Sequence, residues 1–328
     1  MDLYPLTFEP ILKERIWGGR RLEQLYHKAL PDGVPVGESW EISDRPGDVS
    51  VVSNGPLAGK DLHWLVENLG RQLLGPTQLH AGRFPLLIKI LDARASLSLQ
   101  VHPPAARAAL LGGAPKTEMW YVAEAVPDAE LYVGLRRGCT KKEFGERIRD
   151  GTVADCFHRV RVRAGDVMFL PSGRVHALGA GMVIFEIQQN SDTTYRVFDW
   201  NRLGLDGKPR DLHIKESLES IDFEDFEPGL VQPRLRPGPV GLAALVEDEL
   251  FSVDLGKMNV GQSLSLVPGK MQILGIVSGT LRVRAGAEEL VLAGGQFCLL
   301  PASLPAVALQ AQSAATFLRV DANKKAAL

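Results

Sequence analysis

The chain has 328 residues, of which 45% are hydrophobic, so it is long enough to bury one large core or two medium ones. Its 37 basic and 39 acidic residues are intermixed and give a formal net charge of -2. This balance excludes the strongly basic surface that is typical of proteins binding nucleic acid or a membrane, and it favours a small molecule as the partner.

The sequence carries no signal for secretion or for insertion into a membrane. The segment 1–6 lacks the basic and apolar stretches of a signal peptide, and no run approaches the roughly 18 apolar residues of a membrane span. Cys139, Cys156 and Cys298 are widely spaced and form no CxxC pair, which disfavours a disulfide framework or a thiolate zinc site. We therefore expect a cytoplasmic protein, in which any metal is held by nitrogen and oxygen.

Short β-rich runs, separated by Gly and Pro, dominate the first two thirds of the chain. The predicted strands are residues 84–91, 118–122, 130–135, 160–163, 167–170 and 182–188. The predicted helices between them are residues 61–74, 104–111, 141–149 and 213–221, the third of which opens with a capping box from Thr140 to Glu143. This pattern predicts a mainly β fold, a sandwich or barrel with helical insertions.

A proline-rich stretch follows the last predicted helix. Residues 222–239 read as a linker, and we place a domain boundary near residue 235. Beyond it the pattern is again one of short strands, predicted at residues 250–255, 263–267, 271–278, 280–284 and 296–300. The sequence therefore predicts an N-terminal domain over residues 1–235 and a C-terminal domain over residues 236–328.

The two predicted domains contain matching segments. Residues 165–176 align with residues 295–306, with glycine, apolar run and proline in register. Both segments resemble the glycine turn, strand and proline turn of cupin jelly rolls, in which the following strand carries a metal-binding His. Because Ala306 stands at the position of His176, we predict two cupin-type jelly-roll domains, of which the second has lost its metal ligands.

Four polar residues in strand-like surroundings form a candidate metal site. Gln100 and His102 are two residues apart in an alternating pattern, so both project from one strand face. Glu118 lies in a largely apolar strand and needs a partner to offset its burial, and His176 follows the cupin-type turn. Two imidazoles, an amide oxygen and a carboxylate suit zinc with an open position, although manganese or iron(II) fits such ligands nearly as well. The alternative is that each His is an ordinary hydrogen-bonded core or surface residue.

The chain resembles the type I mannose-6-phosphate isomerases, particularly the short bacterial form. The segments that carry the resemblance are residues 16–19 (IWGG), 37–43 (GESWEIS), 85–92 (PLLIKILD), 100–103 (QVHP), 116–120 (KTEMW) and 188–200 (QQNSDTTYRVFDW). The resemblance implies a reversible interconversion of mannose 6-phosphate and fructose 6-phosphate, and Arg196 as the active-site arginine. It also implies one zinc ion per chain, with the ligands Gln100, His102, Glu118 and His176.

An aldose-ketose isomerisation moves a proton between adjacent carbons through an enediol, so it needs a base near the carbons and a positive group near the developing oxyanion. We predict Glu186 as the base, because it lies in the strand after the His176 turn and ten residues before Arg196. The alternative for Glu186 is an outward-facing strand acid. Arg196 is predicted to stabilise the enediolate or to hold the phosphate, the alternative being a salt bridge to Asp192 or Asp199.

Other parts of the predicted site are less specific. Lys116 lies on the strand face of Glu118 and is predicted to contact sugar hydroxyls, unless it is a solvated strand-end lysine. Trp17 and Trp40 either wall the sugar pocket or belong to the core. No glycine-rich phosphate loop is visible, so a phosphate must be held by side chains such as Arg196, Arg202, Lys89 or Arg94.

Two other functions and two oligomeric states stay open at this point. One alternative is another cupin metalloenzyme, such as an iron dioxygenase or an isomerase or epimerase of a different sugar. The second is a cupin that binds sugar or regulates without catalysis. The sequence leaves the chain as a monomer or a homodimer.

Overall fold

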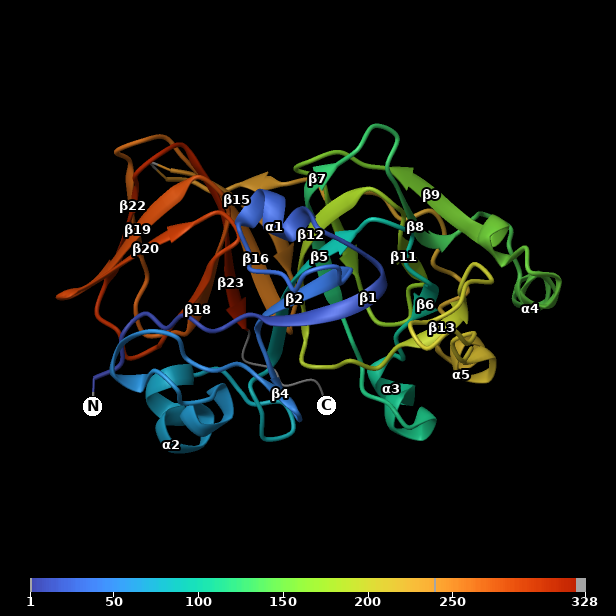
Figure 1. Ribbon diagram of the computed structural model, residues 1–328, viewed down its shortest axis with the longest axis horizontal. Helices are drawn as coiled ribbons and strands as arrows, with labels where there is room; N and C mark the ends of the chain where they lie inside the picture. Colours follow the sequence, from blue (N-terminus) through green and yellow to red (C-terminus); the bar gives the residue numbers. More distant parts are fainter. Residues whose placement is uncertain (1, 239, 323–328) are drawn as a thin grey trace.

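The computed structural model describes residues 2–238 and 240–322, and residues 323–328 of the predicted second domain lie outside the described part (Figure 1). The fold is mainly β, and its named strands pair antiparallel in two large pairs of sheets and one short hairpin. Strands from the first 200 residues form one pair of sheets, and strands from residue 234 onward form the other. In Figure 1 these two groups occupy opposite halves of the molecule. The predicted mainly β fold is thus confirmed.

The first pair consists of a six-stranded and a five-stranded sheet. The six-stranded sheet has the order β1 (Ile11–Gly19), β2 (Val36–Ile42), β5 (Leu86–Ala93), β12 (Met182–Gln189), β7 (Glu118–Ala125) and β10 (Val167–Leu170). The five-stranded sheet has the order β13 (Tyr195–Phe198), β6 (Leu99–Val101), β11 (His176–Leu178), β8 (Glu130–Leu135) and β9 (Phe157–Arg161). The short hairpin joins β3 (Asp44–Arg45) to β4 (Asp48–Val49).

The second pair consists of a six-stranded and a four-stranded sheet. The larger has the order β14 (Arg234–Leu235), β15 (Gly241–Glu247), β16 (Phe251–Met258), β23 (Ala315–Ala322), β18 (Gln272–Ser278) and β21 (Phe297–Leu300). The smaller has the order β17 (Ser263–Leu266), β22 (Val307–Ala311), β19 (Thr280–Ala285) and β20 (Glu288–Ala293).

Short helices decorate the first half of the molecule. They are α1 (Arg21–Tyr26), α2 (Leu62–Leu74), α3 (Ala105–Ala108), α4 (Lys141–Asp150) and α5 (Ile214–Ser220), with 3-10 turns η1 (Gly55–Leu57), η2 (Ala109–Leu111) and η3 (Val153–Cys156). The N-cap half of the predicted capping box of α4 is confirmed, because the Thr140 hydroxyl accepts a hydrogen bond from the Glu143 amide at 3.1 Å. The Glu143 carboxylate accepts from Arg136 and Arg147 instead. Among the described residues, no helix has the length and apolar character needed to cross a membrane.

The two faces of strand β12 explain how the core is divided. Val183, Phe185 and Ile187 alternate along one face and are fully buried in a cluster that also contains residues of β16, β18 and β23. This cluster packs the two six-stranded sheets against each other, and the Phe185 and Phe297 rings lie 5.4 Å apart there. The residues between them, including Glu186, therefore project to the opposite face of the sheet.

The structure differs from the predicted elements at two places. Residue 239 of the predicted linker lies outside the described residues, and residues 222–238 do not form an extended linker throughout. Asp225 receives hydrogen bonds from Arg174 at 2.8 Å, and Arg234–Leu235 form the edge strand β14. Besides β14, the strands without a counterpart among the predicted strands are β1, β2, β3, β4, β13, β15, β20, β22 and β23. Most of these strands are buried on both faces or lie at edges, where a simple alternation of apolar and polar residues is weak.

Candidate functional site

Three potential metal ligands converge at the ends of three strands. His102 follows β6 directly, Glu118 begins β7, and His176 begins β11, which pairs with β6 so that His176 lies opposite Gln100. One ligand atom from each of His102, Glu118 and His176 lies within 4.8 Å of the others, and all three side chains are buried. Residues that are 74 positions apart in the chain are therefore brought to one point by strand pairing.

Glu118 is the acid of this cluster, and it is fully buried. Both of its carboxylate oxygens are buried and accept no hydrogen bond of normal geometry from the residues that the structure describes. Their close neighbours are Lys116 Nζ at 2.8 Å, His176 Nε2 at 3.3 Å and His102 Nε2 at 3.5 Å. Burial alone would raise the pKa of Glu118, but these positive and imidazole groups hold the pKa well below its ordinary value. The site therefore presents a buried, ionised carboxylate with free lone pairs.

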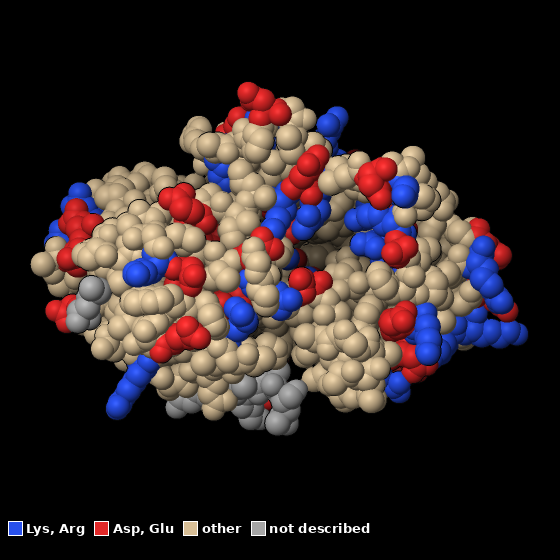
Figure 2. Space-filling model, turned by 60° about the horizontal axis from the view of Figure 1, so that its bottom comes forward, with Lys and Arg blue, Asp and Glu red and all other residues tan. Residues whose placement is uncertain are grey.

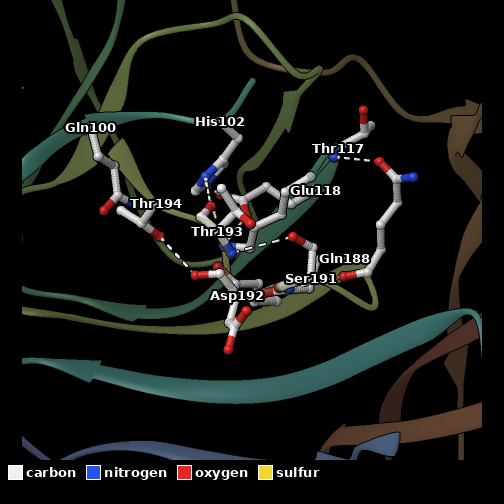
Figure 3. Close-up of polar contacts among 12 residues, drawn as sticks. Gln100, His102, Thr117, Glu118, Gln188, Ser191, Asp192, Thr193 and Thr194 are labelled. Carbon is white, nitrogen blue, oxygen red and sulfur yellow. Dashed lines mark hydrogen bonds and ion pairs between the residues drawn. The ribbon is translucent and has the colours of Figure 1, made fainter. Parts of the chain in front are cut away.

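The two imidazoles are fixed in the tautomer that suits a metal. The Nδ1–H of His102 donates to the carbonyl of Thr193 at 2.7 Å (Figure 3). The Nδ1–H of His176 donates to the carbonyl of Arg174 at 2.9 Å. Each ring therefore turns its Nε2 toward Glu118. Burial, assisted by Lys116, lowers the pKa of His102 to about 4, and burial also lowers the pKa of His176. Both rings are thus neutral at physiological pH, which is the form that binds metal.

Gln100 completes the set of four predicted ligands. It projects from β6 to the same side as His102 (Figure 3), and its Nε2 lies 3.4 Å from His176 Nε2. The structure therefore brings all four predicted residues together. Nitrogen and oxygen donors of this kind suit zinc or another first-row metal.

A cavity of about 650 Å³ opens beside this cluster, within the size range of small-molecule sites. Figure 2 shows a hollow with side chains of both charges at its rim. Gln100 and Lys116 line the cavity and also contact the cluster. Of the two alternatives for Trp17 and Trp40, both residues form part of the cavity wall, and Trp17 also belongs to a core cluster. The cavity is also lined by Arg15, Glu38, Lys89, Trp120, Glu186, Arg196 and Arg210.

Glu186 and Lys116 both lie in this cavity rather than in solvent. The Glu186 side chain is 3% exposed, and its Oε1 accepts a hydrogen bond from Trp120 Nε1 at 2.9 Å. Lys116 is 5% exposed and lies 3.3 Å from His102 Nε2 as well as beside Glu118. Burial alone would lower the pKa of Lys116, but the Glu118 and Glu186 carboxylates hold it above its ordinary value. The alternatives of an outward-facing acid and a solvated lysine do not apply.

Arg196 also lines the cavity, without the ion pair that was the alternative to a functional role. Its guanidinium donates to the carbonyl of Asp211 at 2.7 Å, while its buried Nε has no partner among the described residues. Asp199 instead pairs with Arg202 and Arg210. Burial, together with Arg210, lowers the pKa of Arg196. Arg196 therefore retains hydrogen-bonding capacity toward the cavity.

The four cationic candidates for phosphate binding are placed differently. Arg196 and Lys89 line the cavity, whereas Arg202 is engaged by Asp199 and by the carbonyl of Ser96. Arg94 is exposed and is not among the described residues that line the cavity.

Glu38 is a cavity residue to which sequence reasoning gave no role. Its carboxylate accepts hydrogen bonds from Trp40 Nε1 at 2.6 Å and from Arg15 Nε at 2.7 Å. Burial alone would raise the pKa of Glu38, but Lys89 and Arg15 lower it to about 2. A signal was available in the sequence, because Glu38 and Trp40 alternate in the segment 37–43 that carries the family resemblance.

Comparisons with known proteins point to one family. The family model for the catalytic domain of type I phosphomannose isomerase matches residues 6–140. The mannose-6-phosphate isomerase ManA of Bacillus subtilis is 38% identical over 93% of this chain and 95% of its own length. The mannose-6-phosphate isomerase of Streptococcus mutans is 36% identical over 90% of this chain and 92% of its own.

Solved structures show the same fold. The crystal structure of the mannose 6-phosphate isomerase from Bacillus subtilis superposes with a TM-score of 0.89 at 30% identity, covering 97% of this chain and 99% of that one. A zinc-bound mannose 6-phosphate isomerase superposes with a TM-score of 0.79 at 18% identity, covering 98% and 100%, and shares the fold. The extent of these matches, over nearly the whole of each relative, shows that the chain belongs to the type I mannose-6-phosphate isomerase family of enzymes.

Proposed function

We propose that this chain interconverts mannose 6-phosphate and fructose 6-phosphate through an enediol. The observation that carries the proposal is the convergence of two neutral imidazoles on the buried carboxylate of Glu118, beside a cavity of about 650 Å³. The relatives named for this reaction cover nine tenths or more of the chain, which supports the same substrate here.

We propose one zinc ion per chain as the cofactor, with the ligands Gln100, His102, Glu118 and His176. Burying an ionised carboxylate without a compensating charge costs several kcal/mol. Lys116 contacts Oε2 of Glu118, whereas Oε1 faces the imidazole of His176, so a metal would compensate the charge on that side. A zinc-bound relative of the same fold supports zinc over other metals. When bound, zinc supplies a Lewis acid that polarises the oxygens of the sugar.

The side chains of the cavity then carry the proton transfer. Glu186 takes the proton from carbon 2 of the open-chain aldose and returns it to carbon 1, while the hydroxyl proton passes from oxygen 2 to oxygen 1. Trp120 holds one oxygen of the Glu186 carboxylate and thereby fixes its orientation. Arg196 stabilises the negative charge of the enediolate or holds the phosphate, and Lys116 contacts the sugar hydroxyls beside the metal.

The domain organisation belongs to the same proposal. We place the catalytic cupin-type jelly roll in residues 1–235 and a second jelly roll without metal ligands in residues 236–328. The two pairs of antiparallel sheets support this division.

The test combines metal analysis of the purified protein with a coupled assay for fructose 6-phosphate formed from mannose 6-phosphate. We expect close to one zinc per chain and turnover that disappears on chelation and returns with added zinc. Glucose 6-phosphate serves as the substrate control and should be a much poorer substrate.

Two outcomes would favour the other members of the cupin class. Bound iron with an oxygen requirement would indicate an oxygenase, and faster turnover of a different sugar would indicate an isomerase or epimerase of that sugar. Stoichiometric zinc without turnover of any hexose 6-phosphate would contradict the proposed reaction.

A further inference from the structure

A row of alternating charges crosses the wall of the cavity on neighbouring strands. Arg15 on β1 donates to Glu38 on β2 at 2.7 Å, and Lys89 Nζ on β5 lies 3.7 Å from Glu38 Oε2. On its other side, Lys89 Nζ lies 3.0 Å from Glu186 Oε2 on β12. A single ammonium group is thus shared between two carboxylates.

Strand register places the partners of this lysine in one line. Lys89 is paired with Trp40 on β2 and with Glu186 on β12, and Glu186 is in turn paired with Trp120 on β7. The Lys89 ammonium also lies 5.1 Å from the centroid of the Trp40 ring. Its position is therefore determined by two adjacent strands and an aromatic face, and not by a flexible contact at the surface.

Burial makes this arrangement sensitive to the loss of any member. Lys89 is 6% exposed, between Glu38 at 8% and Glu186 at 3%. Removing one partner of a buried ion pair destabilises a protein far more than removing one partner of an exposed pair, because the remaining buried charge has no compensation. Without Lys89, the carboxylates of Glu38 and Glu186 would face each other in the cavity wall. Arg15 would still pair with Glu38.

Oε1 of the Glu186 carboxylate accepts a hydrogen bond from Trp120 Nε1, whereas Oε2 lies 3.0 Å from Lys89 Nζ in an ion pair that lacks the geometry of a hydrogen bond. The two contacts act on different oxygens, so together they restrict the orientation of the carboxylate. A base that transfers a proton between two adjacent carbons must keep its orientation through both steps, and a displacement of about 1 Å can cost on the order of 10²-fold in rate.

We propose that Lys89 is a positioning residue, which acts through Glu186 and is itself held by Glu38. This inference rests on the proposed isomerase function and on Glu186 as its base. Glu38 stays ionised throughout the working range of an enzyme, since Lys89 and Arg15 lower its pKa to about 2. It is therefore a permanent counter-charge that keeps the ammonium between the two acids.

The decisive experiment is a double-mutant cycle on kcat with the zinc-loaded enzyme. Lys89→Met should lower kcat on the order of 10²-fold with KM changed less than about threefold and zinc content unchanged. In a Glu186→Gln background, Lys89→Met should change kcat less than about threefold, because the group on which it acts is already gone. Losses that simply multiply in the double variant would overturn the proposal.

A matched control is available beside the same sheet, where Lys28 of the loop before β2 contacts Glu41 on β2. Lys28 and Glu41 form another buried ion pair at 2.7 Å, with side chains 9% and 6% exposed, in a separate cavity. Lys28→Met removes the same charge from a similar environment and should leave kcat within about twofold of the wild type. An equal loss of kcat in this control would show that the effect of Lys89→Met is structural, and would reject the proposal.

A second variant guards against a Lys89 variant that does not fold. Glu38→Gln keeps the volume of the side chain and removes the counter-charge, and it should lower kcat several-fold with KM retained. If kcat is unchanged in both Lys89→Met and Glu38→Gln while the wild type turns over normally, the positioning role of Lys89 is rejected but the proposed function is not. A zinc-loaded wild type that fails to convert mannose 6-phosphate would reject the proposed function itself.

Discussion

The two halves of the molecule have corresponding strand orders and different interiors. In the larger sheets, β2-β5-β12-β7-β10 corresponds to β15-β16-β23-β18-β21, and in the smaller sheets β6-β11-β8-β9 corresponds to β17-β22-β19-β20. The turns also match, because Gly165 and Gly295 both have a positive φ ahead of β10 and β21. The same topology therefore holds a candidate metal site in one half and an apolar interior in the other.

Register identifies what replaces each potential ligand. Glu118 is paired with Leu170 on β10, and Gln272 is paired with Leu300 on β21, so Gln272 stands at the position of Glu118. Extending the β17–β22 register by one residue places Ala306 opposite Val267, as His176 is opposite Gln100. Val267 therefore corresponds to Gln100, and Gly269, two residues later, corresponds to His102. The counterparts of Gln100, His102, Glu118 and His176 are thus Val267, Gly269, Gln272 and Ala306.

The comparison teaches that the site depends on few side chains, and not on the fold. None of Val267, Gly269 and Ala306 offers a side-chain group that binds a metal, and the interior of the second half is filled by a cluster that includes Leu274, Leu309 and Phe317. The same framework can thus serve catalysis or packing, according to which residues occupy four positions.

The largest expected effect is on metal binding, which should differ between the two halves. His176→Ala should lose zinc and lower turnover at least about 10³-fold, since a metal contributes several kcal/mol to the stabilisation of developing charge. The matched change Ala306→His should gain no zinc, because a lone imidazole finds no partner ligands in the second half. Metal analysis and the coupled assay measure both. A second zinc in Ala306→His would break the comparison.

Packing in the second half gives the next effect. Phe317 is fully buried and lies over Gly256, where an added Cβ would be 2.2 Å from the ring. Phe317→Ala should lower the free energy of unfolding by about 3–5 kcal/mol, as for other buried aromatic residues. Chemical denaturation measures this loss, while zinc content and the kcat of the folded enzyme should stay near the wild-type values. A loss of zinc would mean that the metal site depends on the interior of the second half.

The sequence revealed the candidate metal ligands more readily than the wall of the cavity. Local alternation indicates His102, the apolar surroundings of a carboxylate indicate Glu118, and the turn before the strand indicates His176. Glu38 and Lys89 lie on strands that are buried along their whole length, so their alternation carries little contrast. The contacts of Lys89 with Glu38 and Glu186 depend on the order of β2, β5 and β12, which no local pattern encodes.

Removal of the metal should have a smaller effect on stability, and this effect should depend on the site in the first half. A ligand that binds the native state at a free concentration of about 100 times its Kd contributes about 2.7 kcal/mol to stability. Chelation should therefore lower the unfolding midpoint of the wild type, and restored zinc should reverse the change. His176→Ala should show neither response, which a thermal melt with and without chelator will test. A zinc-dependent midpoint in that variant would place the stabilising ion elsewhere.

The smallest effect concerns the counterpart of Glu118. Gln272 is 3% exposed, and its Nε2 donates to the carbonyl of Val267 at 2.9 Å, while its Oε1 is buried without a partner among the described residues. Gln272→Met loses a hydrogen bond and relieves an unsatisfied acceptor, so the free energy of unfolding should change by less than about 1.5 kcal/mol. Zinc content and kcat should not change, whereas Glu118→Gln should abolish both. Equal effects of the two substitutions on zinc would show that the second position still takes part in metal binding.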